Sequence, residues 1–168
     1  GKRFLIDPML ADQGAYPEVP ETTSTGRGNP DCDLPCPVES LFDVDAVIVT
    51  HLHFDHFDEV AAKVLPKALT LFSQSEEEAQ ILRGMGFDDV RVLSGEGIAF
   101  DGVRLYRTKC DHGSSNLVTV DGYKDRGLTE KASGVVFESA AETERFYLAG
   151  DTIYCQLVVD AVEKFKPG

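Results

Sequence analysis

Three histidines and one aspartate are crowded into a single six-residue segment of this 168-residue chain. The segment, residues 51–56, reads His-Leu-His-Phe-Asp-His and directly follows an apolar, β-branched run at 46–50. Imidazole nitrogens and carboxylate oxygens are common ligands of divalent transition metals. One further histidine, His112, completes the chain's total of four. These residue types point to metal chemistry, with enough donor atoms in one segment to begin two sites.

The spacing suits a pair of metal sites at the end of a strand. In an extended segment, residues two apart point to the same side, so His51 and His53 can hold one ion. Asp55 and His56 lie at the turn that follows and would face an adjacent position. His112 can supply a third nitrogen to the first ion, which leaves a fourth position for water, as in catalytic zinc sites. The alternative is that each histidine is an ordinary hydrogen-bonded residue.

Two aspartates outside the segment are candidates for supporting roles. Asp151 lies in a Gly-Asp-Thr turn after a predicted strand and could bridge two ions, or it could cap the final helix, since aspartate is a favoured N-cap residue. Asp7 could orient a ligand histidine, or form a turn before Pro8. Two divalent ions with two carboxylates and one hydroxide keep a net positive charge, so a small-molecule substrate could be anionic.

The charge balance disfavours some partners. Aspartate and glutamate outnumber lysine and arginine by 29 to 16, for a formal net charge of −13. This opposes nucleic acid and anionic membranes, because phosphate binding depends on basic side chains. No apolar run approaches the ~20 residues that span a bilayer.

Four cysteines are too few for a disulfide scaffold, so we expect a cytoplasmic protein. Cys32 and Cys36 have the spacing of half a zinc site, but no second Cys/His pair is free to complete it.

Short strands alternate with helices, which predicts a mixed α/β layered domain. Ser75 and Glu78 form a capping-box pattern at the start of a helix, and Asp101-Gly102 is a strong hairpin signal. We predict strands over 4–6, 46–50, 69–72, 90–93, 98–100, 103–106, 134–137 and 145–149. We predict helices over about 57–65, from 75 to about 84–86, and along the apolar stripe Val158, Ala161, Val162 and Phe165.

Two long segments have no periodic pattern. Residues 8–40 hold six of the eight prolines and would form either a lid over a binding site or a loop that packs over one face. Residues 113–133 are polar and are predicted to be a second surface loop. Four side chains near the expected cleft could contact an anion or simply be solvated: Tyr16, Arg27, Arg107 and Lys109.

Four motifs resemble those of the metallo-β-lactamase superfamily, in that family's order. They are Leu-Ile-Asp-Pro at 5–8, Thr-His-Leu-His-Phe-Asp-His at 50–56, His-Gly at 112–113 and Ala-Gly-Asp-Thr at 149–152. The chain is most similar to the broad branch of predicted metal-dependent hydrolases that includes the ascorbate-phosphate lactonases. His53 is a histidine where the diiron branch that reduces oxygen and nitric oxide has glutamate, which argues against that activity.

The resemblance implies an αββα sandwich with two metal ions at one edge. By motif, His51, His53 and His112 would hold the first ion, and Asp55, His56 and a bridging Asp151 would hold the second. Zinc is the expected metal, and manganese and iron also suit mixed histidine and carboxylate ligands. Family members continue past the Asp151 motif with further strands and a last histidine ligand. We therefore expect a single domain over 1–168, incomplete at both ends, whose second site is incomplete or is completed by another segment.

The ligand set and the resemblance together predict a metallo-hydrolase. A metal-activated hydroxide would attack an ester, lactone, thioester or phosphoester, with Asp55 as the catalytic residue that positions it and moves its proton. One alternative is a nuclease of the same superfamily, which the lack of a basic patch disfavours. The other is a catalytically impaired metal-binding fragment that is stable only with a partner chain or as a homo-oligomer.

Overall fold

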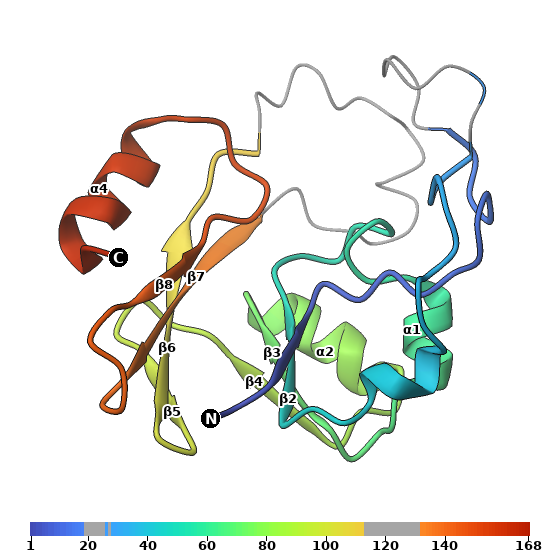
Figure 1. Ribbon diagram of the computed structural model, residues 1–168, viewed down its shortest axis with the longest axis horizontal. Helices are drawn as coiled ribbons and strands as arrows, with labels where there is room; N and C mark the ends of the chain where they lie inside the picture. Colours follow the sequence, from blue (N-terminus) through green and yellow to red (C-terminus); the bar gives the residue numbers. More distant parts are fainter. Residues whose placement is uncertain (19–25, 27, 113–131) are drawn as a thin grey trace.

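Two four-stranded sheets form the centre of the fold (Figure 1), in a computed structural model that describes residues 1–18, 26, 28–112 and 132–168. The first sheet is parallel, in the order of its strands β1 (Phe4–Ile6), β2 (Ala46–Val49), β3 (Thr70–Ser73) and β4 (Asp89–Val92). The second is antiparallel and contains β5 (Ile98–Phe100), β6 (Val103–Lys109), β7 (Ser133–Ser139) and β8 (Phe146–Leu148).

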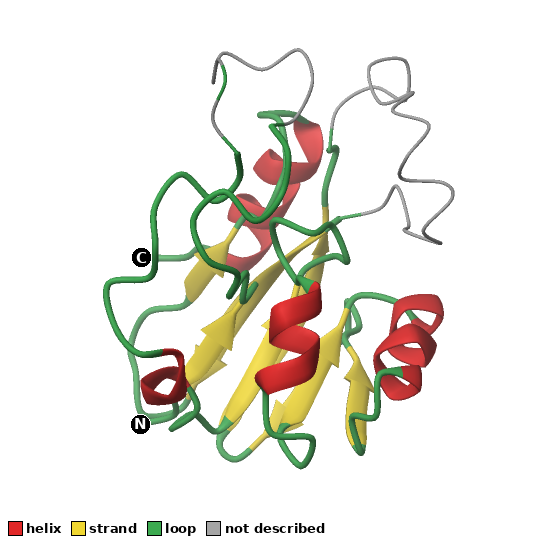
Figure 2. Cartoon of the chain, turned by 90° about the vertical axis from the view of Figure 1, so that its right-hand side faces the viewer, coloured by secondary structure: helices red, strands yellow, loops and turns green. Residues whose placement is uncertain are grey.

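Helices cover the outer faces of both sheets. The helices α1 (Glu59–Val64) and α2 (Glu76–Gly84) lie on the first sheet, as Figure 2 shows, and α4 (Gln156–Phe165) lies on the second. The ring of Phe165 is 5.0 Å from that of Tyr106 on β6. A short 3-10 helix, η1 (Val38–Leu41), precedes β2. Among the described residues, no helix combines the length and the apolar character needed to cross a membrane. The helix–sheet–sheet–helix order confirms the predicted αββα fold class.

The apolar run at 46–50 is explained by burial on both faces of β2. Ala46 and Ile48 belong to the core between the two sheets, whereas Val47 and Val49 belong to the core under the helices. Side chains alternate across a strand, so a strand covered on both faces needs apolar residues at every position. All four side chains are fully buried. β2 is thus a rigid support for the histidine segment that follows it.

Element boundaries agree with the sequence pattern to within a few residues. The largest differences are in β6, which continues to Lys109, and β7, which spans Ser133–Ser139. The two strands pair without interruption from Val103↔Ser139 to Lys109↔Ser133. Backbone hydrogen bonds between them therefore extend both strands over polar residues that the sequence pattern did not predict to be in a strand. In the 8–40 segment the described part contains η1 and a bridge between Tyr16 and Asn29. Most of the predicted 113–133 loop lies outside the described residues.

The buried carboxylate of Asp58 ties the loop after β1 to the start of α1. It accepts hydrogen bonds from the backbone N–H groups of Leu10 (3.1 Å), Ala11 (2.8 Å) and Ala61 (2.6 Å). Asp58 is therefore the N-cap of α1, one position before Glu59, its first residue, whereas the predicted helix began at about residue 57 and had Asp58 in its first turn. The cap satisfies one orphan helix donor, and the two other bonds anchor the segment that follows β1 and Asp7.

We expect Asp58→Ala to lower the free energy of unfolding by about 2–3 kcal/mol, because it removes a cap and leaves two buried N–H groups without an acceptor. Urea denaturation followed by circular dichroism measures this loss. The neighbouring Glu59→Ala is the matched control, since Glu59 is exposed and its carboxylate forms a 3.6 Å surface pair with Lys63. Equal effects of the two substitutions would contradict the anchoring role.

Candidate metal centre

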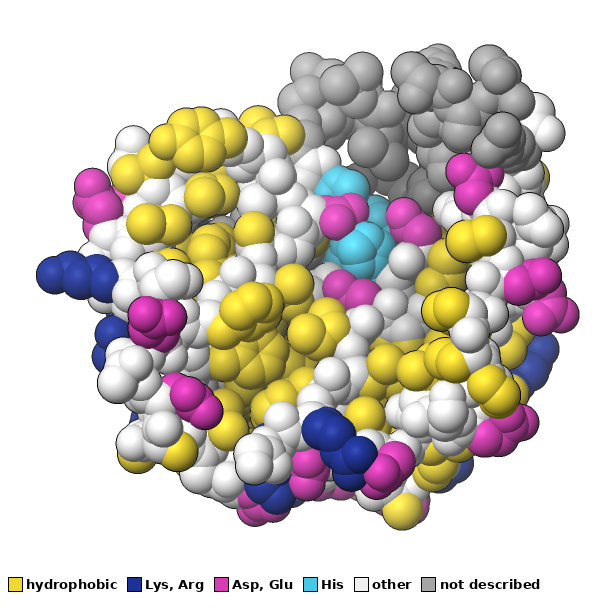
Figure 3. Space-filling view, in the orientation of Figure 1, with side chains coloured by type: hydrophobic (Ala, Val, Ile, Leu, Met, Phe, Trp, Pro, Cys, Tyr) yellow, Lys and Arg dark blue, Asp and Glu magenta, His cyan; other side chains and the backbone are white. Residues whose placement is uncertain are grey.

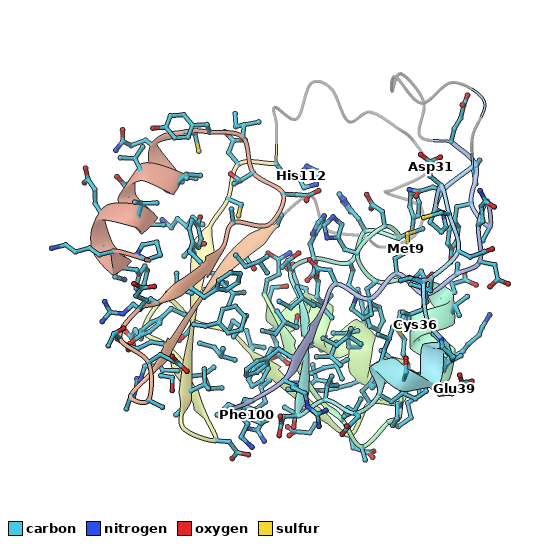
Figure 4. All side chains as sticks on the ribbon, in the orientation of Figure 1. Met9, Asp31, Cys36, Glu39, Phe100 and His112 are labelled. Atoms are coloured by element: carbon cyan, nitrogen blue, oxygen red, sulfur yellow. The ribbon has the colours of Figure 1, made fainter. Side chains whose placement is uncertain are left out.

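The predicted ligands gather where strands of both sheets end. Asp7 follows β1, His51 lies two residues after β2, His112 three residues after β6, and Asp151 three residues after β8. Ligands in α/β folds commonly bind beyond the carboxyl ends of the strands. Figure 4 shows His112 between the two halves of the molecule, and Figure 3 shows histidine side chains inside a hollow flanked by carboxylates. Segments far apart in the sequence therefore meet at one edge of the sandwich.

Two groups of three side chains can each offer converging ligand atoms. The first contains His51, His53 and His112, and the second contains His51, His56 and Asp151. Within each group the ligand atoms all lie within 4.8 Å of one another. His51 Nε2 is 3.0 Å from His53 Nδ1, and the rings of His51 and His56 are 4.1 Å apart. The four histidines thus form one cluster in which His51 is central.

Asp151 stands between the two groups. Its Oδ2 atom lies 3.1 Å from His56 Nε2 and 3.1 Å from His112 Nε2, and 3.9 Å from His51 Nε2. The final helix begins later, with Cys155 at its N-cap position. The hypothesis that Asp151 caps the final helix is therefore wrong, because the helix begins four residues after the position that this role would require. One carboxylate oxygen that faces three imidazoles has the placement that a bridging ligand needs.

The donor set fits a divalent metal ion. His112 Nε2 is buried and makes no hydrogen bond to the described residues, although Asp151 Oδ2 is close to it. A buried ring nitrogen without a hydrogen bond is costly unless another partner satisfies it, and a metal ion would be such a partner. Histidine nitrogens with a carboxylate suit zinc, manganese and iron. The residues present therefore match the group that the motifs imply.

Burial and mutual repulsion keep the central imidazole neutral. His51 is fully buried, and burial, with the neighbouring His56, His53 and His112, lowers its pKa to about 2. Burial likewise lowers the pKa of His53. Burial also acts to lower the pKa of His56, but the hydrogen bond and charge of Asp7, together with Asp151 and Asp55, raise it to about 8. A neutral imidazole keeps the lone pair that a metal ion requires.

Asp55 lies at the margin of the cluster. Its charge acts on His53 and His56, but its side chain is exposed and belongs to neither ligand group. The turn at 54–56 directs it toward solvent while His56 turns inward. Of the six predicted metal ligands, the structure brings together His51, His53, His56, His112 and Asp151, and it leaves Asp55 outside.

Asp7 lies behind the cluster and contacts it directly. Its Oδ2 is 3.0 Å from His56 Nδ1. It also accepts hydrogen bonds from the backbone N–H of Thr50 (2.7 Å) and from the Thr50 hydroxyl (2.8 Å). Asp7 has a backbone φ of +46°, a left-handed conformation that aspartate tolerates better than most residues. Asp7 therefore fills both of the roles considered for it, since it forms the turn before Pro8 and also contacts His56.

Sequence reasoning missed a buried carboxylate that supports the histidine segment. Glu78 is fully buried and accepts hydrogen bonds from the backbone N–H of Leu52 (3.3 Å) and from Gln74 Nε2 (2.9 Å). The capping pattern located the helix start correctly, since Ser75 Oγ accepts from the Glu78 N–H. The glutamate side chain, however, also reaches across to the segment between His51 and His53. No sequence signal marks that contact.

Two of the four candidate anion contacts have structural partners. Arg107 donates to the backbone carbonyl of Gln74 (3.0 Å), and the ring of Tyr16 lies 5.1 Å from that of Phe54. Lys109 is exposed at the end of β6, and Arg27 lies outside the described residues.

Burial raises the pKa of the Cys110 thiol to about 11, and its Sγ donates to the carbonyl of Ala149, so Cys110 is a neutral, packed residue.

Relatives of this chain are named as hydrolases or as UPF0173 proteins. It is 41% identical over 167 residues to the UPF0173 protein YddR of Bacillus subtilis (strain 168), a match that covers 99% of this chain and 62% of YddR. The crystal structure of an isothiocyanate hydrolase from Delia radicum gut bacteria superimposes with a TM-score of 0.86 at 39% identity, covering 99% of this chain and 63% of that one.

A possible metal-dependent hydrolase from Veillonella parvula DSM 2008 also superimposes with a TM-score of 0.86, at 35% identity, over 98% of this chain and 62% of that one. The chain thus spans about three-fifths of the length of these relatives. A family model described as a beta-lactamase superfamily domain matches residues 2–167. The match extends over nearly the whole chain and confirms the resemblance to the metallo-β-lactamases, so the chain belongs to the β-lactamase superfamily.

Proposed function

We propose that this chain carries the metal-binding part of a metal-dependent hydrolase. The observation that supports this most strongly is the position of Asp151 Oδ2, 3.1 Å from both His56 Nε2 and His112 Nε2. It links two groups of ligand atoms that can each hold an ion. The names of the structural relatives, an isothiocyanate hydrolase and a possible metal-dependent hydrolase, agree with this class of reaction.

The residues divide into roles that the motifs predict. His51, His53 and His112 would hold one ion, and His56 with Asp151 would hold a second, to which Asp55 would be added if its side chain turns inward. Zinc is our first choice, and manganese or iron would also fit. When bound, such ions act as Lewis acids and lower the pKa of a water ligand to roughly 7. Asp55 would orient the water and accept its proton, a role that its position beside His53 and His56 allows.

The proposed substrate is a small molecule with an electrophilic carbonyl-like or phosphoryl centre. Esters, lactones, thioesters and phosphoesters belong to this class, and the name of the structural relative adds isothiocyanates. Nucleic acid is disfavoured by the net charge of −13. An anionic substrate remains part of the proposal because two bound ions would outweigh the nearby carboxylates.

Metal removal is the direct test. We expect the purified chain to contain up to two divalent ions by elemental analysis, and dialysis against a chelator to abolish hydrolysis across a panel of esters, lactones, thioesters, phosphoesters and an isothiocyanate. Zinc, manganese or ferrous iron, added back one at a time, should restore the activity, and magnesium should not, because it prefers oxygen ligands. Full activity in the chelated, metal-free protein would refute the proposal.

A second candidate function follows from the exposed position of Asp55, which leaves the second group with fewer ligands than the motifs predict. The chain would bind metal but hydrolyse nothing without a partner chain or a second copy of itself. The Bacillus subtilis relative provides a comparison, since it can be prepared both whole and as the 62% that matches this chain. Loss of activity with retention of metal in the shortened relative would favour this candidate. Light scattering would show whether either form is an oligomer.

A further inference from the structure

A hydrogen-bonded path leads from one carboxylate to two of the histidines. Asp7 Oδ2 is 3.0 Å from His56 Nδ1 and accepts a hydrogen bond from the Thr50 hydroxyl at 2.8 Å. The same hydroxyl oxygen lies 3.1 Å from His51 Nδ1. Thr50 and His51 are both fully buried. Water therefore does not compete for the contact between Thr50 and His51.

The chemistry of the partners sets the direction of every bond on this path. An ionised carboxylate can only accept, so Asp7 must receive the proton of the Thr50 hydroxyl and the proton on His56 Nδ1. A hydroxyl has one proton to donate. Once Thr50 has given it to Asp7, its oxygen can only accept, and the donor must be His51 Nδ1. Both Nδ1 atoms then carry hydrogen, and the Nε2 atoms face the cluster.

We propose that the Thr50 hydroxyl, directed by Asp7, is a positioning group that fixes the tautomer of His51 with its Nε2 lone pair toward the metal centre. Asp7 acts on His56 directly and on His51 through Thr50, so one carboxylate prepares a ligand in each of the two groups. The identity of these histidines as metal ligands rests on the proposed function. The hydrogen-bond directions themselves do not depend on it.

The opposite direction is less favourable for two reasons. If Thr50 donated to His51 Nδ1, Asp7 Oδ2 would lose a donor in a partly buried site. His51 would then carry its proton on Nε2 and donate it to His53 Nδ1 at 3.0 Å, whereas in the Nδ1–H tautomer of His51 the donor of that contact is His53 Nδ1. A metal ion would have to displace that proton. A fixed Nδ1–H tautomer removes this cost before the ion arrives.

Three variants separate the hydroxyl from the shape of the side chain. Thr50→Val keeps the volume and the β-branch but removes the hydroxyl, and Thr50→Ser keeps the hydroxyl. Asp7→Asn suits the left-handed backbone at this position. Its amide oxygen would stay with the Thr50 backbone N–H, and its NH2 group, which cannot accept, would face the Thr50 hydroxyl and His56. Thermal melts by circular dichroism establish that each variant folds.

Histidine tautomers are read from long-range nitrogen–proton NMR spectra of the ¹⁵N-labelled, metal-free protein. The four histidines can be assigned by single substitutions. We expect His51 to be the Nδ1–H tautomer in the unsubstituted protein and in Thr50→Ser, and to shift toward Nε2–H in Thr50→Val and Asp7→Asn. Zinc affinity, measured by competition with a chromophoric chelator, should fall by about 10–100-fold in Thr50→Val and recover in Thr50→Ser.

An Nε2–H tautomer of His51 in the unsubstituted protein would overturn the proposal. So would an unchanged tautomer in Thr50→Val, or a Thr50→Ser variant as impaired as Thr50→Val. If Thr50→Val does not fold, the tautomer of His51 in Asp7→Asn is the measurement that decides, and an unchanged Nδ1–H tautomer there would overturn the proposal. Failure of the unsubstituted protein to bind zinc, manganese or ferrous iron would refute the proposed function instead, and the tautomers of the metal-free protein would still decide this inference.

Discussion

Replacement of Asp151 by asparagine should lower hydrolytic activity by more than about 100-fold, the upper end of the loss seen when only an outer partner of a metal ligand is removed. The Asp151 carboxylate faces three imidazoles, with its Oδ2 at 3.1 Å from two of them. Asparagine keeps the shape but removes the negative charge that, in the proposed site, would hold two cations close together. Elemental analysis should accordingly find no more than one ion per chain.

The control for this substitution is Asp160→Asn on α4. It makes the same chemical change at an exposed position, where Asp160 Oδ1 accepts a hydrogen bond from Gln156 Nε2 at 2.8 Å. We expect Asp160→Asn to keep the metal content and the activity of the unsubstituted chain. Two retained ions and full activity in Asp151→Asn would show that Asp151 does not bridge the ions.

Replacement of Phe72 by alanine should lower the free energy of unfolding by about 3–5 kcal/mol. Phe72 is fully buried on β3, in the core between the two sheets. Its ring meets that of Phe100 edge to face, with centroids 5.3 Å apart. Alanine would leave a cavity at the centre of the sandwich, and the rigid strands on either side cannot collapse to fill it. Because domains of this size are marginally stable, part of the population would unfold at room temperature.

Phe146→Ala is the matched control for this stability prediction. Phe146 is the same residue type on β8, but it is 59% exposed, and its ring lies 5.7 Å from that of Phe137. Its loss should cost less than about 1.5 kcal/mol. Urea denaturation of both variants measures the difference. A Phe146→Ala loss as large as that of Phe72→Ala would contradict the assignment of the core.

Local sequence patterns predicted most of the elements. The hairpin at Asp101-Gly102, the helix start at Ser75 and the apolar stripe ending at Phe165 are all present. Each of these signals is contained within a few consecutive residues, because turn geometry, capping and periodicity are local. The ends of β6 and β7 were not predicted, since their length depends on pairing between strands far apart in the chain.

Spacing also predicted that His51 and His53 would face one side, because an extended segment alternates its side chains. The structure agrees, with 3.0 Å between His51 Nε2 and His53 Nδ1. The same reasoning did not anticipate that Asp55 would face solvent. It also missed Glu78, whose carboxylate reaches the backbone between the two histidines from a neighbouring helix.

The sequence by itself determined the residue types available for chemistry, the strand that carries the histidine segment and the family to which the chain belongs. Only the tertiary structure decided which side chains meet. Asp7, His112 and Asp151 follow three different strands in two sheets, and their distances to the histidine segment depend on how those sheets pack. The physical reason is that propensities and motifs act over a few residues, whereas convergence of ligand atoms depends on burial of the core between β2, β3 and the second sheet.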